Sequence, residues 1–131
     1  MQLKNEIKYF NSLIGVKLIM IDSYNFGTIT INKQKFIKDL IIYPDHITSN
    51  WRRKTGHLLI ENDITEVIDY KPEILIIGIG ASGLMKIDEK LKEKLKTLGI
   101  ESVIKKTAEA VDEYNRIYKG KRVVCALHLT C

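Results

Sequence analysis

Residues 74–87, which read ILIIGIGASGLMKI, decide the fold class that the sequence predicts. A short apolar run over 74–77 indicates a buried strand, and the glycines after it indicate a loop. Gly78, Gly80 and Gly83 have the spacing G-x-G-x-x-G. A loop of this kind at the end of a strand exposes backbone N–H groups that can hold an anion. The stretch therefore predicts an α/β protein with a candidate anion site beside a strand end.

Outward from this stretch, helices and strands alternate. The pattern predicts a helix capped by Asn62 or Asp63, a strand at 74–77, a helix from Asp88 to Gly99, a strand at 102–105, a helix capped by Thr107 and ended by Gly120, and a strand at 122–127. A βαβαβ run of this kind implies parallel strand pairs and right-handed crossovers. We expect a mixed central sheet with helices packed on it.

A β-hairpin is predicted before this core. Segments 26–31 and 36–43 have the pattern of two strands, joined by residues 32–35, and a further short strand is expected at 47–51. Asn32 is the residue of that turn that best tolerates a left-handed conformation. The hairpin either makes the whole sheet mixed or adds a second small sheet.

The first residues of the chain differ in pattern from the rest of it. A loose helical period and then a strand-like segment precede Met20, which is a plausible alternative start. We therefore expect residues 1–19 to be an N-terminal extension and residues 20–131 to be a single α/β domain. A transit peptide is disfavoured, because this segment has no arginine and carries Glu6.

Composition predicts an ordinary globular protein. The 131 residues are 45% hydrophobic and 28% charged, and no apolar run approaches the roughly 20 residues that span a bilayer. There is no secretory signal, and Cys125 and Cys131 do not indicate a disulfide framework. We expect a cytoplasmic location.

The net charge of +5 leaves nucleic acid open as a partner, but the charge pattern disfavours it. Many lysines alternate with acidic residues, as over 88–98, where the pattern is that of a solvated helix face. RNA recognition also needs several exposed aromatic side chains on one sheet face. No such stacking motif is readable in the sequence.

A dinucleotide cofactor is not expected, despite the glycine spacing. Such a site needs a helix that begins inside the motif, whereas the next helix begins after Asp88. It also needs an acidic residue about 20 positions further on, where this chain has Lys105 and Lys106. Finally, the motif normally comes after the first strand of the fold, whereas a predicted hairpin and helix precede it in this chain.

Two interpretations of the glycine loop remain. In one, the glycines only permit a tight turn and the close approach of another backbone. In the other, the loop holds a phosphate or carboxylate together with the basic segment 52–57, whose arginines suit oxyanions. The candidate anion-binding residues are Arg52, Arg53, His57, Gly78, Gly80, Ser82, Gly83 and Lys86.

Other chemistry is not indicated. Ser82 lacks the G-x-S-x-G spacing of a nucleophile elbow, and no acid–histidine pairing is readable. Cys125, His128 and Cys131 are spaced by three, but a strand alternates faces, so Cys125 and His128 are expected to point to opposite sides. We therefore expect no catalytic residue and no metal site.

Several segments resemble the Mth-domain family of small proteins of unknown function. They are YNFGTI at 24–29, DLIIYPD at 39–45, WRRKTGH at 51–57, KPE at 71–73, GIGASG at 78–83, TAEA at 107–110 and ALHLTC at 126–131. The resemblance runs from about Met20 to Cys131. It implies an α/β fold with a mixed sheet, and it names neither an activity nor catalytic residues. Relatives in this family also often place a helix-capping serine where this chain has Ile60.

One member of that family, a mitochondrial complex I assembly factor, acts by binding other proteins. The sequence thus favours a binding or assembly-type protein, whose ligand is a protein partner or an anionic small molecule. The alternative is an enzyme or binding protein for a phosphorylated or carboxylate compound at the glycine loop. The oligomeric state stays open.

Overall fold

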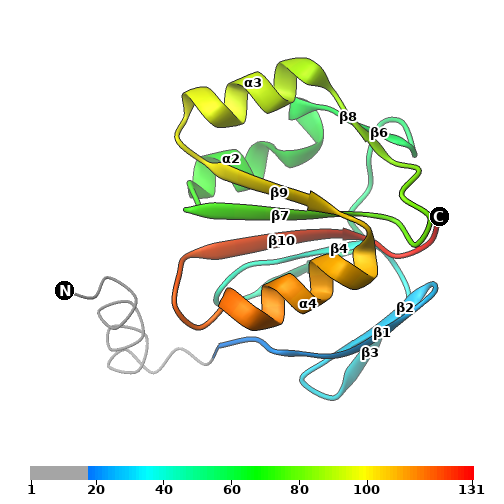
Figure 1. The fold of residues 1–131 in the computed structure, drawn as a ribbon. Helices are drawn as coiled ribbons and strands as arrows, with labels where there is room; N and C mark the ends of the chain where they lie inside the picture. Colours follow the sequence, from blue (N-terminus) through cyan, green and yellow to red (C-terminus); the bar gives the residue numbers. More distant parts are fainter. Residues whose placement is uncertain (1–17) are drawn as a thin grey trace.

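The computed structural model describes residues 18–131, and it confirms the predicted α/β fold class (Figure 1). The main sheet has five strands in the order β5-β4-β10-β7-β9. Its strands are β4 (Leu40–Ile42), β5 (Ile47–Ser49), β7 (Ile74–Ile79), β9 (Glu101–Lys105) and β10 (Val123–His128). β10 pairs with β7 in parallel and with β4 in antiparallel orientation, so the sheet is mixed as predicted.

The βαβαβ core has the predicted order β7, α3 (Glu89–Thr97), β9, α4 (Thr107–Ile117) and β10. The two helices cover opposite faces of the main sheet (Figure 1). Leu91 and Leu95 of α3 pack on one face, together with η1 (Glu61–Ile64) and α2 (Thr65–Tyr70). Ala110 and Val111 of α4 pack on the other face. Each helix thus buries an apolar stripe against β-branched and leucine side chains of the strands.

A second, three-stranded antiparallel sheet lies against α4. It consists of β1 (Ile21–Asn25), β2 (Thr28–Ile31) and β3 (Gln34–Phe36) in that order. The β2–β3 turn places Asn32 and Lys33 at positive φ, of 50° and 69°, which is the conformation of a tight hairpin turn. The Asn115 side chain of α4 bonds both the N–H and the carbonyl of Ile21 and ties the small sheet to the core.

The prediction of one strand over 36–43 is wrong. Residues up to Phe36 belong to the small sheet, and residues from Leu40 belong to the main sheet. Ile37 is 67% exposed in the crossing between them, and the Asp39 carboxylate is taken up by polar partners. The chain therefore changes sheets at this point, where Lys38 and Asp39 interrupt the apolar residues of the predicted strand.

Two predicted helix caps are also wrong. The first helical segment has Ile60 at its N-cap position, and the Asp63 carboxylate accepts from the Ile60 N–H at 3.0 Å. The N-cap of α4 is Lys106, whereas Thr107 is the first helical residue and is fully buried. Ile60 thus occupies the capping position, where the Mth-domain resemblance places a serine. α3 begins after Asp88 as predicted, and Gly99, at positive φ, lies just past its end.

The predicted N-terminal extension lies mostly outside the described residues. Of its described part, Ile19 is buried in the core, and its carbonyl accepts a hydrogen bond from the Tyr114 hydroxyl. Within residues 18–131, no helix has the length and apolar character needed to cross a membrane.

Candidate functional site

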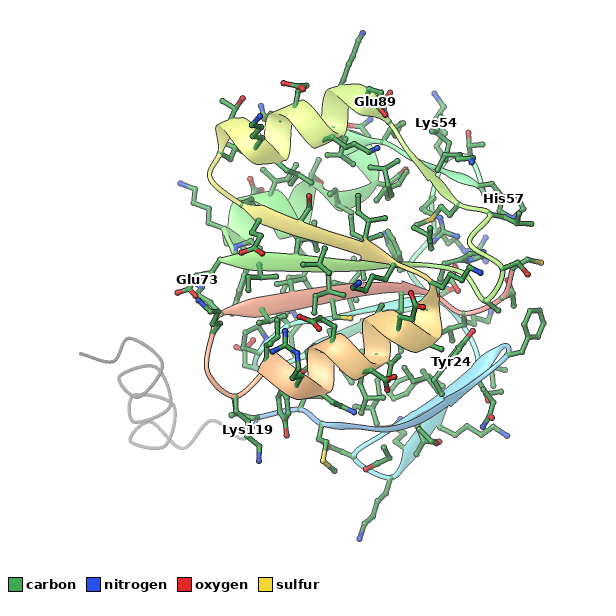
Figure 2. All side chains as sticks on the ribbon, viewed as in Figure 1. Tyr24, Lys54, His57, Glu73, Glu89 and Lys119 are labelled. Atoms are coloured by element: carbon green, nitrogen blue, oxygen red, sulfur yellow. The ribbon has the colours of Figure 1, made fainter. Side chains whose placement is uncertain are left out.

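The candidate site lies at the carboxyl edge of the parallel strands, where three segments of the chain meet. They are the basic loop 52–57, the glycine loop 80–85 and residues 129–131 after β10. The basic loop contacts the segment after the glycine loop directly, because the His57 carbonyl accepts from the Lys86 N–H at 2.7 Å. This contact joins two short parallel strands, β6 (Leu58–Leu59) and β8 (Lys86–Ile87). Figure 2 shows His57 on the same side of the molecule as the labelled C-terminus of Figure 1.

A buried polar cluster of Asp39, Arg53 and His128 lies at this meeting point. The Asp39 Oδ2 atom lies 2.8 Å from Arg53 Nη2 and 2.8 Å from His128 Nδ1. Its Oδ1 atom accepts from the Leu129 N–H at 2.8 Å. The side chains of Arg53, Asp39 and His128 are only 5%, 16% and 8% exposed. This charged cluster is therefore part of the interior, held between the loop before β4, the basic loop and the end of β10.

Hydrogen bonds keep the Asp39 carboxylate ionised. Burial alone would raise the pKa of Asp39, but hydrogen bonds from Leu129, His128 and Arg53 together hold that pKa below its ordinary value. Because an ionised carboxylate only accepts, His128 Nδ1 carries a proton and donates a hydrogen bond to Asp39. Arg53 Nη2, 3.1 Å from the same Nδ1 atom, shares Asp39 Oδ2 as its acceptor.

Two nitrogen atoms of this cluster, Arg53 Nη1 and His128 Nε2, are buried and have no hydrogen-bond partner among the described residues. The remaining Arg53 atoms are occupied: Nε and Nη2 donate to the Gly56 carbonyl, and the guanidinium lies over the Trp51 ring, 4.7 Å from its centre. The exposed His57 ring lies edge-on to His128, with ring centres 5.8 Å apart. A buried N–H or ring nitrogen without a partner is costly, so these two atoms mark a place for a polar ligand or a bound water.

The glycine loop directs most of its N–H groups into the protein. Ala81 donates to the Thr130 carbonyl at 2.6 Å and Leu84 to the Cys131 carbonyl at 3.1 Å. Gly80 donates to the Thr107 hydroxyl at 2.8 Å, and that hydroxyl donates to the His128 carbonyl at 2.6 Å. The loop thus holds the segment after β10 through its backbone, which is the close approach of another backbone that the first interpretation of the glycines requires.

The three candidate glycines have identifiable packing roles. Gly78 lies within β7, and a Cβ there would be 2.7 Å from the Leu127 side chain. Gly80 has a φ of +103°, and a Cβ there would overlap the carbonyl of Cys131. Gly83 has a φ of +74° and lies against the Lys106 side chain.

The remaining candidate residues are exposed. Arg52, His57, Ser82 and Lys86 all face solvent. No ion pair joins Arg52 or Lys86 to another residue of the part that the structure describes, and the same holds for Lys105 and Lys106 after β9. Lys105 pairs with Gly78 of β7, so Lys105 and Lys106 lie at the end of β9 next to the glycine loop. The edge therefore presents unpaired positive charge.

Sequence reasoning missed the acid–histidine pair of Asp39 and His128, which are 89 residues apart. The spacing of His128 suggests only a metal ligand, and the pattern around Asp39 suggests only a strand residue. Both residues adjoin apolar strand residues, and a buried polar group needs a partner. The polar character of each residue therefore indicates that Asp39 and His128 each need a partner, but it does not indicate that they pair with each other.

The prediction for the cysteines and His128 is confirmed in its geometry. Cys125 belongs to the core cluster on the α4 face, whereas His128 faces Asp39. Burial raises the pKa of the Cys125 thiol, which makes this thiol inert. Within residues 18–131, no group of three or more His, Cys, Asp and Glu side chains is arranged to hold a metal ion.

The fold and this edge define a small α/β domain with a five-stranded mixed sheet, a second small sheet and a glycine loop closed by the chain after β10. Residues 21–128 match the family described as "Protein of unknown function (DUF498/DUF598)", and the chain belongs to this family. The resemblance to the Mth-domain family is thereby confirmed.

Solved structures share the fold. The chain is 23% identical to the conserved hypothetical protein PH1505 of Pyrococcus horikoshii, with a TM-score of 0.73 over 85% of this chain and 98% of that one. It is 25% identical to a Bartonella henselae protein described as an outer membrane protein, with a TM-score of 0.74 over 87% and 97% of the two chains. It is 18% identical to a Bordetella pertussis protein described as a Mth938-like domain, with a TM-score of 0.58 over 84% and 85%.

Proposed function

We propose that this protein is a cytoplasmic binding protein whose ligand is a small molecule with a carboxylate or phosphate group. The ligand binds at the carboxyl edge of the parallel strands, where the basic loop meets the glycine loop. The observation that carries this proposal is Arg53 Nη1, a buried donor at this meeting point that has no partner among the described residues. His128 Nε2, which also lacks a partner there, can accept a hydrogen bond from a hydroxyl group of the ligand. The two cysteines, both free thiols, are consistent with a reducing compartment.

Electrostatics support an anion at this edge. Arg52 precedes Arg53 in the basic loop, and the Lys86 backbone bonds the His57 carbonyl of the same loop. Lys105 and Lys106 come at the end of the neighbouring strand. Asp39 is the acidic residue of the buried cluster, and its charge is already taken up by Arg53 and His128. In the carboxyl-edge crevices of α/β sheets, ligands are commonly bound by the loops after the strands.

In this proposal side chains, and not the backbone N–H groups of the glycine loop, bind the anion. Those N–H groups are mostly occupied by the segment after β10, so side chains supply the positive charge. The exposed His57 ring borders His128 at this edge. Arg53 Nη1 donates to the anion, as guanidinium groups do to oxyanions.

The test is the thermal stability of the purified protein with inorganic phosphate, nucleotides, sugar phosphates, acyl-CoAs and short carboxylates. A ligand that binds this edge at a hundred times its Kd raises the free energy of unfolding by about 2.7 kcal/mol. The Arg52→Ala/Lys86→Ala double variant should lose this stabilisation. Both side chains are exposed, so the fold should be retained.

The matched control is Lys90→Ala/Lys96→Ala, which removes the same charge from the exposed face of α3. It should keep the full stabilisation by the ligand. Stabilisation by none of these anions, or equal loss in the two double variants, would contradict the proposal.

A further inference from the structure

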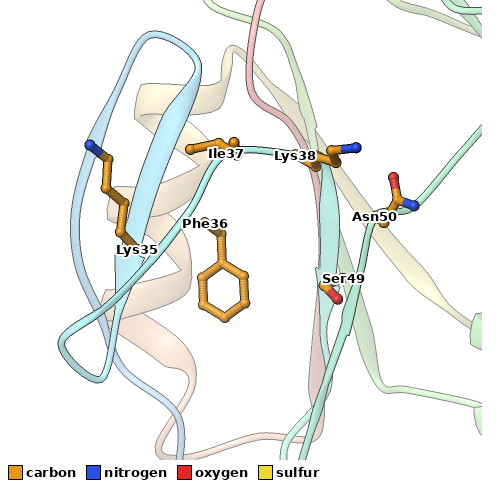
Figure 3. A pocket seen from close by; sticks show the side chains of 6 residues that line it. All are labelled: Lys35, Phe36, Ile37, Lys38, Ser49 and Asn50. Atoms are coloured by element: carbon orange, nitrogen blue, oxygen red, sulfur yellow. The ribbon is translucent and has the colours of Figure 1, made fainter.

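A groove lies between residues 35–38, at and after β3, and residues 49–50, at the end of β5, next to the candidate site. It is lined by Lys35, Phe36, Ile37, Lys38, Ser49 and Asn50. Figure 3 shows the Phe36 ring in the gap between the segment that carries Lys35 and the segment that carries Ser49. The groove encloses about 230 Å³.

The groove combines exposed apolar surface with positive charge. Ile37 is 67% exposed, which is the largest exposed fraction among the large apolar side chains of the described residues. Lys35 and Lys38 are exposed, and neither forms an ion pair with another residue in the described part of the chain. No acidic residue lines the groove. The adjacent Asp39 is committed to Arg53 and His128, so it does not neutralise these lysines.

The size of the groove indicates what fits it. Small-molecule sites usually enclose about 300–1,000 Å³, so this groove is small for a whole ligand and suits a single side chain. Residues of β3, an edge strand of the small sheet, and of β5, an edge strand of the main sheet, line its two walls. Each of these strands has one edge that pairs with no other described strand. An extended peptide adds to such an edge through its main chain and alternates its side chains between pocket and solvent.

We propose that this groove binds an extended, acidic segment of a partner protein. An apolar side chain of the segment packs on Phe36 and Ile37, and acidic neighbours pair with Lys35 and Lys38. The proposed partner is thus a protein. Its groove has other lining residues than the anion site but adjoins it, because Lys38 precedes Asp39 in the chain.

The test uses a fluorescein-labelled decapeptide that alternates glutamate with isoleucine or valine, and measures its binding by fluorescence anisotropy. The Lys35→Glu/Lys38→Glu variant should bind it at least about tenfold more weakly. Ile37→Asp should weaken binding as well. The control variant Lys90→Glu/Lys96→Glu carries the same change in net charge on α3 and should bind the peptide within about twofold of the original protein.

NMR locates the peptide on the protein. Backbone amide shifts should change over residues 35–38 and 47–50 and not over residues 80–86. The inference is overturned by absence of binding, by equal weakening in the two charge-reversal variants, or by shift changes confined to the carboxyl edge. It is also overturned if a peptide with lysine in place of glutamate binds equally well.

Discussion

Asp39 holds three parts of the chain together through one carboxylate. Its Oδ2 atom pairs with Arg53 and His128, its Oδ1 atom accepts from the Leu129 N–H, and its own carbonyl accepts from the Trp51 N–H. The basic loop, the end of β10 and the start of β4 thus share this single residue.

Asp39→Asn should lower the free energy of unfolding by about 3 kcal/mol, because it leaves the buried Arg53 charge without its counter-ion. Denaturation in urea measures the loss. The control is Asp45→Asn, whose carboxylate pairs with His46 at the surface and which should change stability by less than about 0.5 kcal/mol. Equal effects of the two substitutions would show that the buried cluster adds no stability.

The stabilisation by Asp39 should also depend on pH. Its pKa is lower in the folded protein than in the unfolded chain, so its contribution is complete above the unfolded value and is lost as pH falls through the folded value. The stability difference between the original protein and Asp39→Asn should therefore shrink as pH falls below about 4. Urea denaturation at a series of acidic pH values tests this, and a difference that stays constant would contradict it.

Gly80 differs from the other left-handed glycines in what surrounds it. Gly80→Ala should lower the free energy of unfolding by about 2 kcal/mol more than Gly99→Ala, because the new methyl group at Gly80 meets the carbonyl of Cys131, whereas Gly99 faces open space. Both positions have positive φ, so Gly99→Ala reports the backbone strain alone. Equal losses in urea denaturation would mean that the segment after β10 moves away without cost.

At the scale of elements, α4 is joined to the candidate site by its first residue. The Thr107 hydroxyl accepts from the Gly80 N–H and donates to the His128 carbonyl. One buried side chain thus connects β7, β10 and the start of the helix, which explains why it does not cap the helix.

Thr107→Val keeps the shape of this side chain and removes both hydrogen bonds. It should cost about 2–3 kcal/mol, since it leaves a buried N–H and a buried carbonyl with fewer partners. Hydrogen exchange at the Gly80 amide should become faster. Thr65→Val, at an exposed position on α2, is the matched control and should leave that amide unchanged. Unchanged exchange at Gly80 in Thr107→Val would contradict the role of this hydroxyl.

The elements of the core were predictable because their signals are local. The apolar run before Gly78, the break at Asp88 and the glycine after α3 each lie within a few residues of the boundary that they mark. The change of sheet at Ile37 was not predicted, because Lys38 and Asp39 only briefly interrupt an apolar segment, and a continuous strand accommodates one of them on each face. Likewise, the sequence suggested the basic loop as a candidate from its composition alone. The burial of Arg53 involves Asp39 and His128, which come from distant elements.

At the scale of the whole molecule, alkylation of Cys131 reports surface exposure and alkylation of Cys125 reports unfolding. In the folded protein, iodoacetamide should alkylate the exposed Cys131 and leave Cys125, which lies in the central strand β10 and is fully buried. Its thiol is reached only when the main sheet opens, so its alkylation rate should track global unfolding. Mass spectrometry of the Cys131→Ser variant over a range of urea concentrations measures that rate. Alkylation of Cys125 without dependence on urea would show that β10 opens locally.

The place of β10 also has a consequence for how the chain is made. β10 lies between β4 and β7, yet Ile42 of β4 precedes its partner Cys125 by 83 residues. At about 5–20 residues per second, a ribosome needs roughly 4–17 seconds to supply that partner. During this interval the apolar strand β4 has no neighbour on its inner side, and the nascent chain is exposed to aggregation or to chaperones. The centre of the main sheet is thus the part that is assembled last.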